Sequence, residues 1–150
     1  LAPFNAWQII QGLETVGLRM KQHCSNAEKV ITFLETQKKV KNVIYPTNHQ
    51  GEIKERAKKY LSGGNGALVG ADLGTAEAGA KFIDNLKMLY HVANIGDARS
   101  LAIHPASTTH SQLTPGEQLA AGVTPGYVRL SIGIEHPDDI IADIKQALAA

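Results

Sequence analysis

The stretch Tyr127-Val128-Arg129-Leu130-Ser131-Ile132, together with the segment that begins at Pro137, decides the fold class. Apolar and polar side chains alternate along residues 127–132, which is the two-residue period of a strand with one buried face. Pro137 suits the first position of a helix, and Asp138 and Asp139 suit its first turn because acidic groups offset the helix dipole there. A strand followed by an apolar-striped helix indicates an α/β domain.

The same two periods extend the pattern toward the N-terminus. They predict further strands over residues 40–45, 67–73 and 89–94, and further helices over residues 52–61, 76–86 and 114–121. Thr75 suits the N-cap position of the helix over residues 76–86. A long amphipathic helix is predicted within residues 1–36, with a bend near Gly17, from a stripe spaced by three and four residues: Ile9, Leu13, Val16, Met20, Cys24, Ala27, Ile31 and Leu34. The expected fold is an α+β two-layer sandwich, with helices covering a sheet of about four strands.

Composition limits the classes of function. A chain of 150 residues with a net charge of +1 is expected to form one domain, with no strong attraction to nucleic acid or to an anionic membrane. Cys24 is the only cysteine, so it is expected to be a small buried hydrophobe in a protein of the reducing cytoplasm. There is no apolar run of about 20 residues and no signal peptide. Because the sequence starts at Leu1 rather than at methionine, we expect the chain to be part of a longer protein.

Several motifs are better explained by structure than by chemistry. The glycines of residues 63–66 follow a helix and open a strand, the reverse of a dinucleotide-binding loop. His104 and His110 lie too far apart for a tight zinc motif. Ser107, His110 and Asp97 could form a triad on paper, but no nucleophile elbow surrounds them. Acidic residues of the last helix, Asp143 included, are attributed to the helix dipole.

Two features favour function. Residues 94–113 form a long polar connection rich in hydroxyl groups and histidines, and such connections inside compact domains are usually functional. Arg129 lies on the strand face opposite its apolar neighbours. The pattern alone leaves two interpretations open: a solvated or ion-paired strand arginine, or a planar guanidinium that binds a carboxylate in a bidentate manner.

A resemblance covers nearly the whole chain. Residues 94–110 (NIGDARSLAIHPASTTH) resemble the signature loop of the Cys/Met-metabolism family of pyridoxal-phosphate (PLP) enzymes. Residues 128–135 (VRLSIGIE) with 138–144 (DDIIADI) are similar to the closing strand and helix of that family. The opening APFNAW of residues 2–7 and the GLET and LRM within residues 12–20 also match. The motif NIGDA at residues 94–98 is similar to the corresponding motif in the O-acetylhomoserine sulfhydrylase branch of the family.

The resemblance implies a division of labour. Residues 1–150 would be a single C-terminal substrate-binding domain, like the small domain of fold-type I PLP enzymes, with residues 1–36 linking it to a large domain that holds PLP on a lysine. The lysine motif Ser-x-Thr-Lys does not occur in this chain, so no catalytic, cofactor-binding or metal-binding residue is expected here. Arg129 would bind the α-carboxylate of an amino-acid substrate, with Asn94 facing the same group.

The activity implied for the parent enzyme is the conversion of O-acetyl-L-homoserine and sulfide to homocysteine and acetate. The chain alone is expected to be inactive, and the parent enzyme is expected to be a homo-oligomer, because tetramers are usual in the family. Two alternatives remain open: a fragment of a related cystathionine synthase or lyase or methionine γ-lyase, and a non-catalytic module that self-associates through its first helix.

Overall fold

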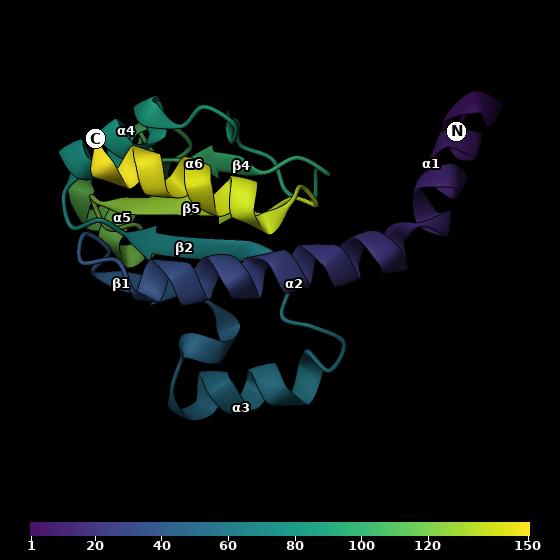
Figure 1. Ribbon diagram of the computed structural model, residues 1–150, viewed down its shortest axis with the longest axis horizontal. Helices are drawn as coiled ribbons and strands as arrows, with labels where there is room; N and C mark the ends of the chain where they lie inside the picture. Colours follow the sequence, from purple (N-terminus) through teal and green to yellow (C-terminus); the bar gives the residue numbers. More distant parts are fainter.

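A five-stranded mixed sheet forms the centre of the computed structural model, which describes all residues 1–150 (Figure 1). The strands run in the order β1-β2-β5-β4-β3, and every neighbouring pair is antiparallel except β3 and β4, which are parallel. Their bounds are β1 Asn42–Ile44, β2 Leu68–Asp72, β3 Tyr90–His91, β4 Leu101–Ile103 and β5 Tyr127–Ser131. The strand that carries Arg129 is therefore the central one.

Helices cover one face of this sheet. The covering helices are α2 (Val16–Glu35), α4 (Ala76–Asn85) and α6 (Pro137–Ala149), which pack on the sheet and on one another (Figure 1). Elsewhere lie α1 (Pro3–Glu14), α3 (Gly51–Tyr60), α5 (Pro115–Ala120) and the short 3-10 turns η1 (Pro46–Asn48) and η2 (Pro105–Ser107). The predicted α/β sandwich is confirmed, and its second sheet face carries far less covering structure.

Strand alternation places the core as the sequence predicted. Val128 and Leu130 of β5 are completely buried on the helix side. Helix starts follow the predicted capping chemistry as well: the Thr75 hydroxyl accepts a hydrogen bond from the Ala78 amide at the start of α4. Such a cap typically stabilises a helix by about 1 kcal/mol. Pro137 begins α6, as its sequence context indicated.

The strand count differs from the prediction. The sheet has five strands rather than about four, because Leu101–Ile103 forms β4 inside a region that was expected to be irregular. All three residues of β4 are buried, so they show no alternation that a sequence pattern could reveal. The strand expected over residues 89–94 is reduced to Tyr90–His91, since the chain leaves the sheet at that edge.

The long first helix is in fact two helices. The chain leaves helical geometry at Thr15 (φ −110°, ψ 3°), two residues before the bend expected at Gly17. In Figure 1, α1 projects away from the domain at an angle to α2. The predicted apolar stripe is buried only in its second half, from Ala27 to Leu34, whereas Ile9 and Leu13 are more than half exposed. Cys24 is half-buried rather than buried.

Candidate functional site

Arg129 lies on the sheet face opposite the helices. It pairs in register with Gly70 of β2 and Ile103 of β4, so one of its two neighbours has no side chain. The Arg129 side chain is partly exposed, and its guanidinium has no carboxylate within ion-pairing distance. A charged, planar donor group without an internal partner is available to a bound anion.

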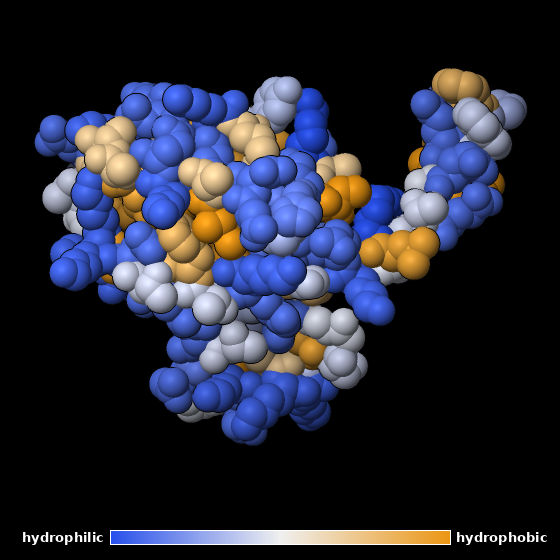
Figure 2. All heavy atoms as spheres, in the orientation of Figure 1, coloured by the Kyte–Doolittle hydropathy of each residue, from blue (hydrophilic) through white to orange (hydrophobic).

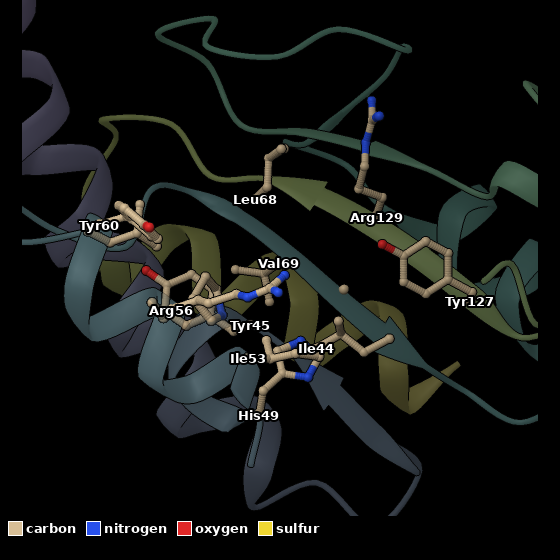
Figure 3. A pocket seen from close by; sticks show the side chains of 14 residues that line it. Ile44, Tyr45, His49, Ile53, Arg56, Tyr60, Leu68, Val69, Tyr127 and Arg129 are labelled. Atoms are coloured by element: carbon tan, nitrogen blue, oxygen red, sulfur yellow. The ribbon is translucent and has the colours of Figure 1, made fainter. Parts of the chain in front are cut away.

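The open space on the Gly70 side is filled by an aromatic ring. A Cβ placed on Gly70 would lie 2.5 Å from Cε2 of Tyr127, so the Tyr127 ring rests directly on the glycine backbone. Burial raises the pKa of the Tyr127 hydroxyl, and the positive charge of Arg129 offsets part of that effect. Tyr127 therefore stays neutral around pH 7 and forms a wall beside Arg129 (Figure 3).

The structure brings the two predicted residues, Arg129 and Asn94, together. The Arg129 Nη2 donates a long hydrogen bond of 3.3 Å to the Asn94 backbone carbonyl. The Asn94 side-chain oxygen accepts from the Ile95 amide at 2.9 Å, which leaves the Asn94 amide nitrogen without a partner in the chain. Arg129 and Asn94 thus meet through the Asn94 backbone between the end of β3 and the centre of β5, and the side chains of both residues keep N–H donors without a partner in the chain.

Two cavities share Arg129 as a wall residue. The larger, of about 470 Å³, lies between the sheet and α3, and its lining is mostly apolar. Figure 3 shows Ile53, Arg56 and Tyr60 of α3 facing it, while the Arg129 guanidinium points away from α3. The smaller cavity, of about 250 Å³, has a mixed lining of apolar and polar groups: Ile44, Ile103, Pro105, Thr109, His110, Ala121, Gly122, Val123, Tyr127 and Arg129.

Carboxylates hold both ends of the loop that carries Asn94. Before the loop, the Asp143 side chain of α6 accepts hydrogen bonds from the amides of Lys87, Met88 and Leu89 at 2.8–3.0 Å. After the loop, the Glu135 carboxylate accepts from both the amide and the hydroxyl of Ser100, at 2.6 and 2.9 Å. These two anchors fix where the loop meets the sheet.

Asp143 has a different role from the one expected. Burial raises its pKa, but the three backbone donors and the Gln146 amide outweigh this and hold the pKa below its ordinary value. The Asp143 carboxylate is a structural acceptor beyond the first turn of α6, so the helix-dipole explanation was wrong for this residue. A lone acid on a helix gives no sign in the sequence that its partners lie 54 to 56 positions away.

His104 of the signature loop has a structural role. His104 is buried, its Nε2 contacts the Pro125 carbonyl at 2.7 Å, and its Nδ1 contacts the Ser107 hydroxyl at 2.8 Å. His110 pairs with its neighbour Thr109 instead. Asp97 pairs with Arg99. The Ser107, His110 and Asp97 side chains therefore do not assemble into a triad.

The residues around Arg129 do not fit a covalently held PLP. Neither cavity beside Arg129 is lined by a lysine, and a Schiff base requires one. No group of three or more histidine, cysteine or carboxylate side chains has the arrangement of a metal site. None of the helices is long and apolar enough to cross a bilayer. What this face of the sheet offers is a guanidinium without a carboxylate partner.

Comparison with known proteins places this geometry in a family. The model of Cys/Met metabolism PLP-dependent enzymes matches residues 1–149. The chain belongs to that family. An O-acetyl-L-homoserine sulfhydrylase of Leptospira meyeri is 54% identical over 150 residues, which are 99% of this chain and 34% of the relative. An L-methionine gamma-lyase of Fusobacterium nucleatum is 44% identical over 99% of this chain and 38% of the relative.

Solved structures of this Cys/Met-metabolism family share the fold. A putative O-acetylhomoserine (thiol)-lyase of Campylobacter jejuni matches with a TM-score of 0.92 and 44% identity, covering all of this chain and 36% of that one. It carries a pyridoxyl-lysine group at its position 205, beyond the part matched by this chain. A cystathionine gamma-lyase of Lactobacillus plantarum matches with a TM-score of 0.88 and 30% identity, over 99% of this chain and 39% of that one.

The sequence-based family assignment is confirmed, and with it the dependence of the family on PLP. The chain spans about a third of the length of the relatives it matches. Sequence reasoning missed Gly70 and Tyr127 as neighbours of Arg129. A glycine within a predicted buried strand was the available signal, because such a glycine often marks close approach by another group.

Proposed function

We propose that this chain is the C-terminal, substrate-binding part of a PLP-dependent O-acetylhomoserine sulfhydrylase. The observation that carries the proposal is the Arg129 guanidinium: it lies on the less covered sheet face, has no carboxylate partner, and borders two cavities next to Asn94. The 54% identity to a sulfhydrylase over nearly the whole chain supports this branch of the family.

The proposed reaction replaces one substituent on the γ-carbon of O-acetyl-L-homoserine. The Cγ–O bond breaks, acetate leaves, and a Cγ–S bond forms with sulfide to give homocysteine. PLP, when bound in the whole enzyme, supplies an electron sink that acidifies the substrate carbons. Arg129 makes and breaks no bond. It binds the α-carboxylate through paired N–H donors and so fixes how the Cα–H bond is oriented.

Asn94 is the second group of the proposed site. Its backbone carbonyl contacts the guanidinium, and its side-chain amide, which has no partner in the chain, is the proposed second donor to the same carboxylate. The Tyr127 ring excludes water from one side, which strengthens the charge pairing between Arg129 and the bound carboxylate. In this proposal the chain orients the substrate and recognises its carboxylate.

The test uses the full-length enzyme with Arg129→Ala. Removing one partner of a charge pair typically costs about 2–4 kcal/mol, equivalent to a loss in kcat/KM for O-acetylhomoserine of roughly 30- to 900-fold. PLP loading, measured from its absorbance, should stay unchanged, since the residues around Arg129 include no lysine. An Arg129→Ala enzyme with unaltered kcat/KM would contradict the proposed role.

A γ-lyase is the second enzymatic candidate, because a methionine gamma-lyase is 44% identical over nearly the same residues. The two activities separate in a product assay. A sulfhydrylase yields homocysteine only when sulfide is supplied, whereas a lyase releases a thiol and a 2-oxo acid from methionine without added sulfide. Product analysis of the full-length enzyme with each substrate decides between them.

We also propose that residues 1–150 are inactive alone and that α1 docks on the preceding part of the enzyme. The supporting observation is that α1 buries none of its residues although Phe4, Trp7, Ile10 and Leu13 recur every three positions along it. Figure 2 shows apolar residues spread over this projecting arm. Incubating the isolated chain with PLP tests inactivity: a stoichiometric lysine adduct that supports turnover would contradict it.

A further inference from the structure

A third cavity lies at the other end of the domain, on the helix-covered side. It has a volume of about 350 Å³ and is formed where the segment before β1 meets α4 and the C-terminal end of α6. These three segments come together at the end of the molecule marked C in Figure 1. No residue of the Arg129 site lines it. The family chemistry described above leaves this cavity without a role.

The rim of this cavity is positively charged. Four lysines line it, Lys38, Lys39, Lys41 and Lys81; no acidic side chain does, and Ala150 after the end of α6 completes the lining. None of the four is ion-paired with a carboxylate anywhere in the chain. A concentration of unpaired ammonium groups stands out in a chain whose net charge is only +1.

Two of these lysines are held in place by the fold. The Lys39 Nζ donates to the Leu148 backbone carbonyl near the end of α6, where a cation also offsets the helix dipole. The stem of Lys41 lies beside Gly74, since a Cβ there would be 3.5 Å from Lys41 Cγ. The ammonium groups of Lys38 and Lys81 donate no hydrogen bond within the chain, so they are free to move onto a ligand.

The floor of the cavity is apolar. It consists of the aliphatic and aromatic side chains Leu73, Ala78, Phe82, Ala147 and Leu148. Leu73, Phe82 and Leu148 are at most 7% exposed, so they form a solid base continuous with the core. A bare inorganic anion would leave this apolar floor in contact with water. A hydrocarbon tail would cover it and stabilise binding by about 25 cal/mol per Å² of apolar surface removed from water.

We propose that this cavity is a binding site for a small organic anion with a short hydrocarbon tail. The anionic head, a carboxylate or a phosphate monoester, lies among the four lysines, and the tail lies on Phe82 and Leu148. The volume of about 350 Å³ is near the lower end of small-molecule sites, so the tail is a chain of about octyl length and not a long lipid chain. Nucleic acid is not the expected ligand, because it has no hydrocarbon tail that could cover the apolar floor.

The test is calorimetric titration of the full-length enzyme with octanoate and with octyl phosphate, in low salt. Both compounds should bind with a dissociation constant of about 1 mM or tighter, and the tighter of the two identifies the preferred head. Octylamine should not bind, because the lysines repel it. Inorganic phosphate should bind at least ten-fold more weakly than octyl phosphate. Equal binding of inorganic phosphate would overturn the role of the floor.

Two variants locate the site. Lys38→Gln with Lys81→Gln should weaken binding of the anions at least ten-fold, while Lys58→Gln with Lys59→Gln on α3, the same change in charge elsewhere, should leave it unchanged. Ala78→Glu places a carboxylate in the cavity at the first turn of α4, where helices accept acids, and should abolish binding. Absence of binding by the unaltered enzyme, or equal weakening in both lysine pairs, would overturn the proposal.

Discussion

The guanidinium of Arg129 and the backbone carbonyl of Asn94 are 3.3 Å apart, although 35 positions separate the two residues in the chain. The bond engages the main chain of Asn94 and leaves its side-chain amide free. This arrangement separates two contributions: the backbone helps to place Arg129, and the side chain of Asn94 remains available to a ligand. The side-chain contribution can be removed by substitution, while the backbone contribution is kept.

Asn94→Ala keeps the backbone carbonyl and removes the side-chain amide, together with the side-chain oxygen that accepts from the Ile95 N–H. In the full-length enzyme we expect KM for the amino-acid substrate to rise by roughly ten-fold, the effect of losing one hydrogen bond to a charged group, at about 1.5 kcal/mol. The kcat value should change little, because Arg129 still orients the carboxylate. Steady-state kinetics measure both. A larger loss for Asn94→Ala than for Arg129→Ala would reverse the assigned order of importance.

Gly70→Ala tests the contact between β2 and Tyr127. The added methyl group would lie 2.5 Å from Tyr127 Cε2, so the ring must move, and we expect a loss of stability of about 1–3 kcal/mol. Thermal denaturation followed by circular dichroism measures it. Tyr127→Ala should relieve the effect of Gly70→Ala in the double variant. Gly63→Ala, where a methyl group meets open space, is the matched control.

Asp143→Asn removes a carboxylate that accepts three backbone hydrogen bonds. The asparagine amide would face N–H donors with another donor, so we expect the free energy of unfolding to fall by about 1–3 kcal/mol near neutral pH. The folded state lowers the pKa of Asp143 below its ordinary value of 3.8, so its stabilising effect is complete above that pH and is lost as the pH falls through the lower folded value. The difference between Asp143→Asn and the unaltered protein should therefore be constant from pH 5 to 8 and shrink in stronger acid. Urea denaturation across this range is the measurement.

Trp7 reports directly on α1 because it is the only tryptophan in the chain. Its side chain is 55% exposed, so dilute residues 1–150 should show the red-shifted emission of a solvated indole. Raising the concentration should shift the emission to the blue as exposed apolar groups associate. Phe4→Ser with Ile10→Gln should suppress that shift, while Leu119→Gln, an exposed apolar residue of α5, should not. A concentration-independent spectrum with clean monomeric light scattering would argue against self-association.

The sequence was informative wherever a local rule decides the structure. Alternation along residues 127–132 placed Val128 and Leu130 in the core and Arg129 on the other face, and Thr75 and Pro137 marked the helix starts. The three-residue strand β4 was missed because a strand buried on both faces has no alternation. The helix is interrupted at Thr15 and not at Gly17, where the bend was expected, since glycine positions alone do not determine where a helix ends.

The candidate site was predicted unevenly for a similar reason. The resemblance implied the roles of Arg129 and Asn94, which are 35 positions apart in the chain, and the structure brings them within hydrogen-bonding distance. The residues around Arg129 and Asn94 could not be predicted from the sequence, because each of them contacts a partner that is distant in the chain. Tyr127 rests on Gly70, and Glu135 binds Ser100, across separations that no local pattern encodes.

The loop that carries Asn94 is tied to the body of the domain on both sides, by Asp143 before it and by Glu135 after it. A loop fixed at both ends has few conformations left to lose when a ligand arrives. The entropy of ordering the proposed carboxylate-binding groups is therefore already lost during folding. Affinity at the proposed site then also depends on Asp143 and Glu135, which do not contact the substrate. A substitution of either residue would weaken binding although every contacting side chain is unchanged.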